Sequence, residues 1–65
     1  MRSVTYFVEG INGEIISNVS REKAIEVAKK AYDNGDTTVG IGRVKYSQKR
    51  KQYVYTLLPL YFYID

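Results

Sequence analysis

A chain of 65 residues with a net charge of +3 is long enough for one domain, which we place at residues 1–65. It has no cysteine and no histidine, which excludes disulfides, thiolate chemistry and the commonest zinc ligands. Residues 1–36 carry five basic and six acidic side chains, whereas residues 37–64 carry five basic and none acidic. This asymmetry favours an anionic partner for the second half, although it also serves solubility.

The predicted elements begin with a β-hairpin. Residues 4–9 are β-branched and aromatic, as expected of a strand, and Asn12-Gly13 is a strong two-residue turn signal. The second strand then covers about residues 14–18. A tight turn would pair Tyr6 with Val19 and Val8 with Ser17. The side chains expected in the core from this hairpin are Val4, Tyr6, Val8, Ile15 and Val19.

A helix is predicted over residues 21–34. Ser20 is a good N-cap, and Asn34-Gly35 supplies a left-handed stop. Apolar side chains repeat at helical spacing, with charged side chains opposite them, so one face is expected to be buried and the other to lie in water. The apolar face consists of Ala24, Ile25, Val27, Ala28, Ala31 and Tyr32.

A second hairpin is predicted from residues 37–46 and 53–64, which are joined by the loop 47–52. Pairing Tyr46 with Tyr53 gives the hairpin two different faces. The face expected to lie under the helix carries Val39, Ile41, Val54, Leu58, Leu60, Phe62 and Ile64. The opposite face carries Val44, Tyr46, Tyr53, Tyr55, Leu57, Tyr61 and Tyr63.

These elements predict an α+β fold of the ββαββ type. One amphipathic helix packs on one face of a four-stranded, mainly antiparallel sheet, with strand order 2-1-3-4 or, as the alternative, 2-1-4-3. A single helix covers one face only, so the tyrosine row is expected to stay exposed. Pro59 cannot donate to a strand ladder, which favours an edge position for the last strand and leaves it open to pairing with a second copy.

The sequence offers little catalytic chemistry. The seven carboxylates form no evident acid and base pair, and the commonest general base is missing. Gly40-Ile41-Gly42 lies inside a strand pattern and lacks the third glycine and the following helix of a phosphate-binding loop. We therefore expect no enzyme activity, no cofactor and no metal.

The candidate partner-binding residues combine tyrosines with the basic loop. They are Tyr46, Tyr53, Tyr55, Tyr61, Tyr63, Lys49, Arg50 and Lys51. Tyrosine and arginine are enriched among the residues that dominate binding energy at protein interfaces, so a non-catalytic protein-binding module is the first hypothesis. Alternatively, the tyrosines are ordinary strand residues and the cations only solubilise the loop.

Two further hypotheses use the same segment. Five cations and three tyrosines interleave over residues 43–55, as in modules that bind single-stranded nucleic acid, but Arg43 and Lys45 are expected to point away from the tyrosines. The other hypothesis is a self-assembling structural protein that forms a homodimer through the last strand.

We expect no contact with a membrane. The longest apolar stretch, Leu57 to Ile64, is interrupted by Pro59 and far shorter than the roughly 20 residues that cross a bilayer. The first six residues do not look like an apolar signal sequence, and the lack of cysteine fits a reducing compartment. The expected location is cytoplasmic.

The order of the predicted elements resembles that of known small proteins. Two strands, a Ser20-x-x-x-Ala24-x-x-x-Ala28 helix and two further strands, in a chain of this size, resemble phage-encoded anti-CRISPR proteins. These are compact inhibitors that bind a defence nuclease complex. The layout is also similar to small bacterial domains with a helix between strand pairs. The resemblance implies an inhibitor that acts by binding, and it assigns no role to any single residue.

Overall fold

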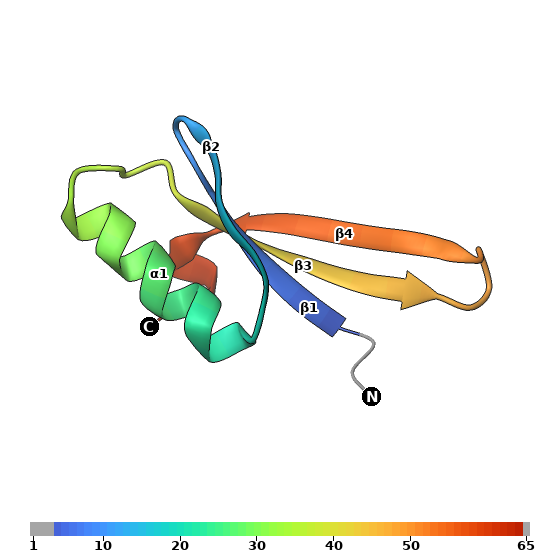
Figure 1. Cartoon of the computed structure of the whole chain (residues 1–65). Coiled ribbons are helices and arrows are strands. Elements are labelled where there is room, and N and C mark those ends of the chain that lie inside the picture. The colour runs from blue at the N-terminus through green and yellow to red at the C-terminus, as the bar shows by residue number, and fades with distance from the viewer. Residues whose placement is uncertain (1–3, 65) are drawn as a thin grey trace.

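The computed structural model describes residues 4–64. Its elements are β1 (Val4–Gly10), β2 (Gly13–Val19), α1 (Arg21–Asp33), β3 (Gly40–Ser47), β4 (Gln52–Pro59) and the short 3-10 helix η1 (Leu60–Phe62). The strands form one antiparallel sheet in the order β2-β1-β3-β4 (Figure 1). The predicted ββαββ fold and the first of the two strand orders are confirmed, and the alternative order is wrong.

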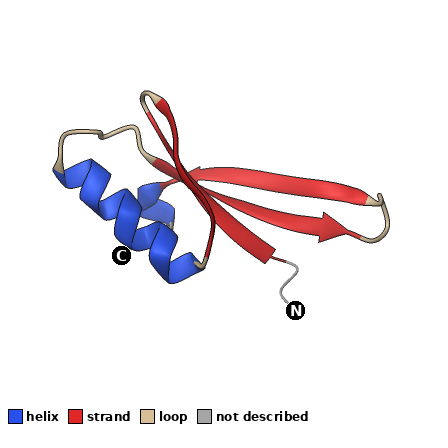
Figure 2. Ribbon diagram, viewed as in Figure 1, coloured by secondary structure: helices blue, strands red, loops and turns tan. Residues whose placement is uncertain are grey.

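The helix covers only part of the sheet. It packs mainly on β1 and also contacts β2, β3 and η1. Beyond the helix, β3 and β4 continue as a projecting hairpin (Figure 2), so the molecule is elongated, with extents of 39 × 20 × 20 Å. We call the sheet face that carries α1 the helix side and the opposite face the open side.

The core lies between α1 and the strands beneath it. Val8 and Ile41 are fully buried and pair across β1 and β3, while Ala24 and Ala28 lie one turn apart on α1 and are also fully buried. Val39 and Leu60 complete the buried set. Tyr32, predicted for the buried face, is 49% exposed, because it borders an open hollow beside Leu60 and Tyr61.

The predicted helix signals are confirmed. The Ser20 hydroxyl accepts a hydrogen bond from the backbone N–H of Lys23 at 3.2 Å, which satisfies one of the free donors in the first turn. Asn34 is the C-cap, and Gly35 follows with a φ of +107°, which glycine adopts without strain. The helix therefore ends at Asp33, one residue before the predicted end.

The first hairpin turn differs from the prediction. Gly10 pairs with Gly13, so the turn residues are Ile11 and Asn12, and the left-handed conformation falls on Gly13 with a φ of +106°. A register shift between Glu9 and Val8 then pairs Val8 with Ile16 instead of Ser17, and a second shift restores the predicted pair of Tyr6 and Val19.

This register exchanges two isoleucines. Ile16 packs against the core, whereas Ile15, predicted to be buried, is 47% exposed. The register shift between Val8 and Glu9 leaves Ile15 as the extra residue of β2, without a partner on β1, and this moves Ile15 out of the core.

The second hairpin keeps its predicted register but not its length. Tyr46 pairs with Tyr53 and Ile41 with Leu58, as predicted. β3 begins at Gly40 instead of residue 37, and β4 ends at Pro59, after which the chain turns into η1. The two-residue alternation fails there, since a 3-10 helix has three residues per turn. Phe62, predicted to be buried, is 60% exposed.

Two further side chains differ in burial from the prediction. Tyr63, predicted to be exposed, is half-buried and packs against the core. Val54, predicted to be buried, is exposed because it belongs to the first half of β4, and that half projects beyond α1 (Figure 1).

Asp36 ties the first turn to the segment before β3. Its carboxylate accepts hydrogen bonds from the backbone N–H groups of Ile11 (2.9 Å) and Thr38 (3.1 Å) and from the Thr38 hydroxyl (2.8 Å). Gly10 leaves room for the carboxylate, because a Cβ at Gly10 would collide with it. The bond from Ile11, followed by that from the Thr38 hydroxyl, holds the pKa of Asp36 below its ordinary value.

We expect Asp36→Ala to lower the midpoint temperature of unfolding at about pH 7. At about pH 2 the decrease should be much smaller. The folded pKa of Asp36 lies below its unfolded pKa, so its contribution is complete above the unfolded pKa and is lost as the pH falls through the folded pKa. Thermal melts of the wild type and the variant check this. Thr38→Val, which removes one donor, should show a smaller change of the same kind. A difference between wild type and Asp36→Ala that stays constant with pH would contradict the assignment.

Candidate functional site

The projecting hairpin has two chemically different faces. Arg43 pairs with Thr56 and Lys45 with Val54, and all four side chains lie on the helix side of the sheet. The pairs between them, among which is Val44 with Tyr55, lie on the open side. The hairpin therefore presents cations on one face and aromatic rings on the other.

Four rings are arranged along the open side. Tyr46 and Tyr53 pack edge to face with centroids 5.1 Å apart, and Phe7 and Tyr55 do so at 6.2 Å. Despite these contacts, Tyr53 is 70% exposed and Tyr55 is 68% exposed. Together with Leu57, which is also exposed, these residues form what we call the aromatic surface: Phe7, Tyr46, Tyr53, Tyr55 and Leu57.

Gly42 explains the position of Phe7. The two residues pair across β1 and β3, and the Phe7 ring occupies the space where a Cβ of residue 42 would lie. An open hollow of about 510 Å³ adjoins this ring, bordered also by Val44 and Tyr55. Glu9 and Glu14, which pair across β1 and β2, lie at the rim of the same hollow.

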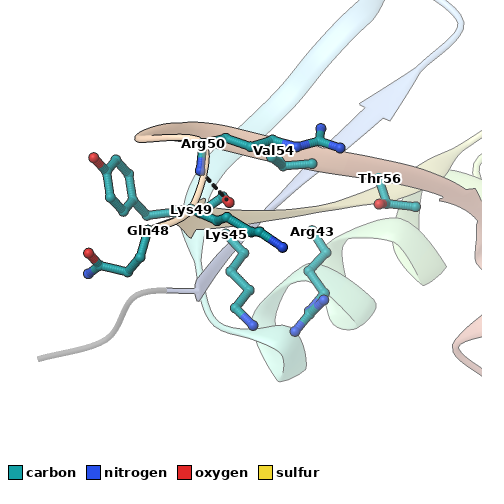
Figure 3. Close-up of a pocket in the computed structure, with 9 residues that line it drawn as sticks. Arg43, Lys45, Gln48, Lys49, Arg50, Val54 and Thr56 are labelled. Atoms are coloured by element: carbon teal, nitrogen blue, oxygen red, sulfur yellow. Dashed lines mark hydrogen bonds between the residues drawn. The ribbon is translucent and has the colours of Figure 1, made fainter.

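Four cations gather on the helix side of the hairpin. Arg43 and Lys45 extend from β3, and Lys49 and Arg50 belong to the turn (Figure 3). They line an open hollow of about 550 Å³, which we call the cationic groove. Its other lining residues are neutral: Tyr46, Ser47, Gln48, Val54 and Thr56. The Arg50 backbone N–H donates to the Ser47 hydroxyl at 3.2 Å and fixes the turn.

The eight predicted site residues do not meet in one place. Tyr46, Tyr53 and Tyr55 belong to the aromatic surface, and Lys49 and Arg50 line the cationic groove. Lys51 is exposed in the turn with a φ of +53° and is not among the residues that line the groove.

The remaining two tyrosines lie beyond β4. Tyr61 is exposed on η1 and stacks on Phe62 with centroids 4.9 Å apart. Tyr63 packs edge to face on Tyr6 at 6.5 Å, and the Arg21 guanidinium lies 5.6 Å from its ring centroid. Burial raises the pKa of the Tyr63 hydroxyl above its ordinary value. Tyr63 thus acts in packing at the edge of the core.

Phe7 and Leu57 of the aromatic surface, and Arg43 and Lys45 of the cationic groove, were missing from the predicted site. Phe7 joins the aromatic surface because β1 pairs with β3, and its signal in the sequence was Gly42, which leaves space for the ring. Arg43 and Lys45 were correctly expected to point away from the tyrosines, but they meet Lys49 and Arg50 on that side.

Comparison with known proteins assigns no relatives. The chain matches no protein-family model, no curated protein and no solved structure. In the described range, residues 4–64, no three carboxylates form a group that could hold a metal ion. Over the same residues, no helix has the length and apolar character to cross a membrane.

Proposed function

We propose that this chain is a non-catalytic binding protein that acts through protein–protein contact at its aromatic surface. The observation that supports this most is the exposure of Tyr53 and Tyr55 on the paired strands β3 and β4. Tyrosines bring a large contact area at a small loss of side-chain entropy, and they are frequent among the residues that dominate interface energies. Contiguous exposed apolar surface of this kind marks interaction sites.

The negative charge beside the aromatic surface favours a protein over a nucleic acid as its partner. Glu9 and Glu14 border the hollow beside Phe7, and their carboxylates would repel the phosphates of a nucleic acid. A protein partner can instead place a lysine or arginine against them while an apolar side chain enters the hollow between Val44 and Leu57.

We extend the proposal to an inhibitor that acts by occupying a surface of a larger complex. The layout resemblance to anti-CRISPR proteins supports a defence complex such as CRISPR-Cas as the target, and the cytoplasm as the place where the two meet. The projecting hairpin suits this role, because both strands extend beyond the part of the sheet that α1 covers (Figure 1).

Affinity capture from the native host tests the proposal. We expect Tyr53→Thr with Tyr55→Thr to lose a partner protein that the wild type retains after nuclease treatment. Threonine keeps the β propensity of both positions, so the strand should survive. If each tyrosine is a hot spot of about 2 kcal/mol, the affinity falls roughly 30-fold for each substitution.

Tyr32→Ala is the matched control, because Tyr32 is also an exposed tyrosine but lies on α1. It should retain the partner. The proposal fails if the double variant melts like the wild type and still captures the same proteins. It also fails if all captured protein is lost on nuclease treatment alone.

A homodimer through β4 is the second candidate function. β4 is an edge strand of the sheet, and its residues, Gln52–Pro59, include no charged side chain. Uncharged edge strands of this length readily pair with another copy. Sedimentation velocity should then show a dimer whose fraction rises with concentration, and Thr56→Lys should abolish it. A monomer at every concentration would remove this candidate.

A further inference from the structure

We propose that the cationic groove is a second binding site, which takes the phosphodiester backbone of a single-stranded nucleic acid. The groove lies on the side of the hairpin opposite the aromatic surface, so both sites can be occupied together. Four positive side chains from a strand and a turn line a single hollow there (Figure 3).

The cations of the groove have no acidic partner among the residues described. The ion pair found between residues 4 and 64 joins Lys23 and Glu26 on α1, at 3.6 Å. No carboxylate lines the groove, and the chain carries none between residues 37 and 64. Like charges held together without a counter-charge create a positive potential that attracts an anion.

The spacing of the donors suits a repeating anion. Arg43 and Lys45 are two residues apart on one strand, hence roughly 6.8 Å apart along it, and Lys49 and Arg50 line the same hollow from the turn. Neighbouring phosphates of an extended nucleic-acid strand can therefore each meet a cation. Arginine can hold a phosphate through two parallel hydrogen bonds.

Neutral donors complete the groove. The Ser47 hydroxyl accepts from the Arg50 backbone N–H, so its own hydrogen is free to bind a phosphate oxygen. Tyr46 also lines the groove, near the hairpin turn, and its ring packs on Tyr53. The Tyr46 ring lies at the end of the groove next to the turn, where a base of a bound strand can stack on it while the backbone follows the cations, and this favours a single strand over a duplex.

Salt dependence of binding to fluorescein-labelled oligothymidine tests the site. Each phosphate neutralised on a single strand contributes about −0.7 to the slope of log affinity against log salt, so four cations give about −2.8. Raising the salt from about 50 to about 200 mM should weaken wild-type binding roughly 50-fold. For Arg43→Gln with Lys45→Gln the slope becomes about −1.4, and the same change in salt should weaken binding roughly 7-fold.

Lys29→Gln with Lys30→Gln is the matched control, since it removes the same charge from the exposed face of α1. In this control, the same increase in salt should still weaken binding roughly 50-fold. If control and groove variant change equally, binding reflects net charge and the proposed site is wrong. If the groove variant does not fold, Lys49→Gln with Arg50→Gln should give the same reduction.

Competitors identify the ligand class. Unlabelled oligothymidine should displace the probe at much lower concentration than polyglutamate of equal length or a DNA duplex. Polyglutamate that competes equally would assign the groove to an acidic protein segment and overturn the nucleic-acid proposal. A duplex that competes equally would overturn the preference for a single strand.

Discussion

Ile41→Ala is expected to lower the free energy of unfolding by about 2–5 kcal/mol. Ile41 is fully buried and pairs with Val8 on β1 and Leu58 on β4, so the cavity left by the substitution would lie in the middle of the sheet. A domain of this length has a total stability of roughly 3–10 kcal/mol, so most of it would be lost. Urea denaturation followed by circular dichroism measures the change.

Ile15→Ala is the matched control for that experiment. The same side chain is removed, but Ile15 is half exposed on β2, and we expect a loss below about 1 kcal/mol. Equal losses for the two variants would contradict the register of the first hairpin, because that register assigns Ile16 and not Ile15 to the core.

Gly42→Ala is expected to destabilise the fold by about 1–3 kcal/mol. The new methyl group would occupy the space of the Phe7 ring, so the ring must leave its place beside Tyr55. The cost should be much smaller in a Phe7→Ala background, where the space is free. A double-mutant cycle of unfolding free energies measures the coupling. If Gly42→Ala costs the same with and without Phe7, the ring does not lie over residue 42.

Most of the fold follows from local patterns in the sequence. The pairing of Tyr46 with Tyr53 followed from the alternation on both strands, and Ser20 and Gly35 define the two ends of the helix. The first turn was misplaced because Asn12-Gly13 can form the turn itself or can leave Gly13 as the left-handed residue after it. Only the pairing of Gly10 with Gly13 distinguishes the two.

The candidate site was predicted less completely, for a geometric reason. A helix of 13 residues is roughly 20 Å long, about half of the 39 Å extent of the molecule. The sequence pattern does not encode where along the sheet the helix lies. Val54 was therefore assigned to the core, although the helix leaves its part of the hairpin uncovered. The cationic groove beside Val54 exists for the same reason.

The projecting hairpin presents two chemically different faces. The open side offers exposed rings with carboxylates at their edge, and the helix side offers four cations with neutral donors. On the two proposals made above, charge favours a protein at the first face and a phosphate backbone at the second.

Methyl NMR on the hairpin tests the separation of the two faces most directly. Val54 and Thr56 carry methyl groups in the cationic groove, whereas Val44 and Leu57 carry them on the open side of the same two strands. Titration with oligothymidine should shift the methyl resonances of Val54 and Thr56 and leave those of Val44 and Leu57 in place. Shifts confined to Val44 and Leu57, or equal on both faces, would contradict the account.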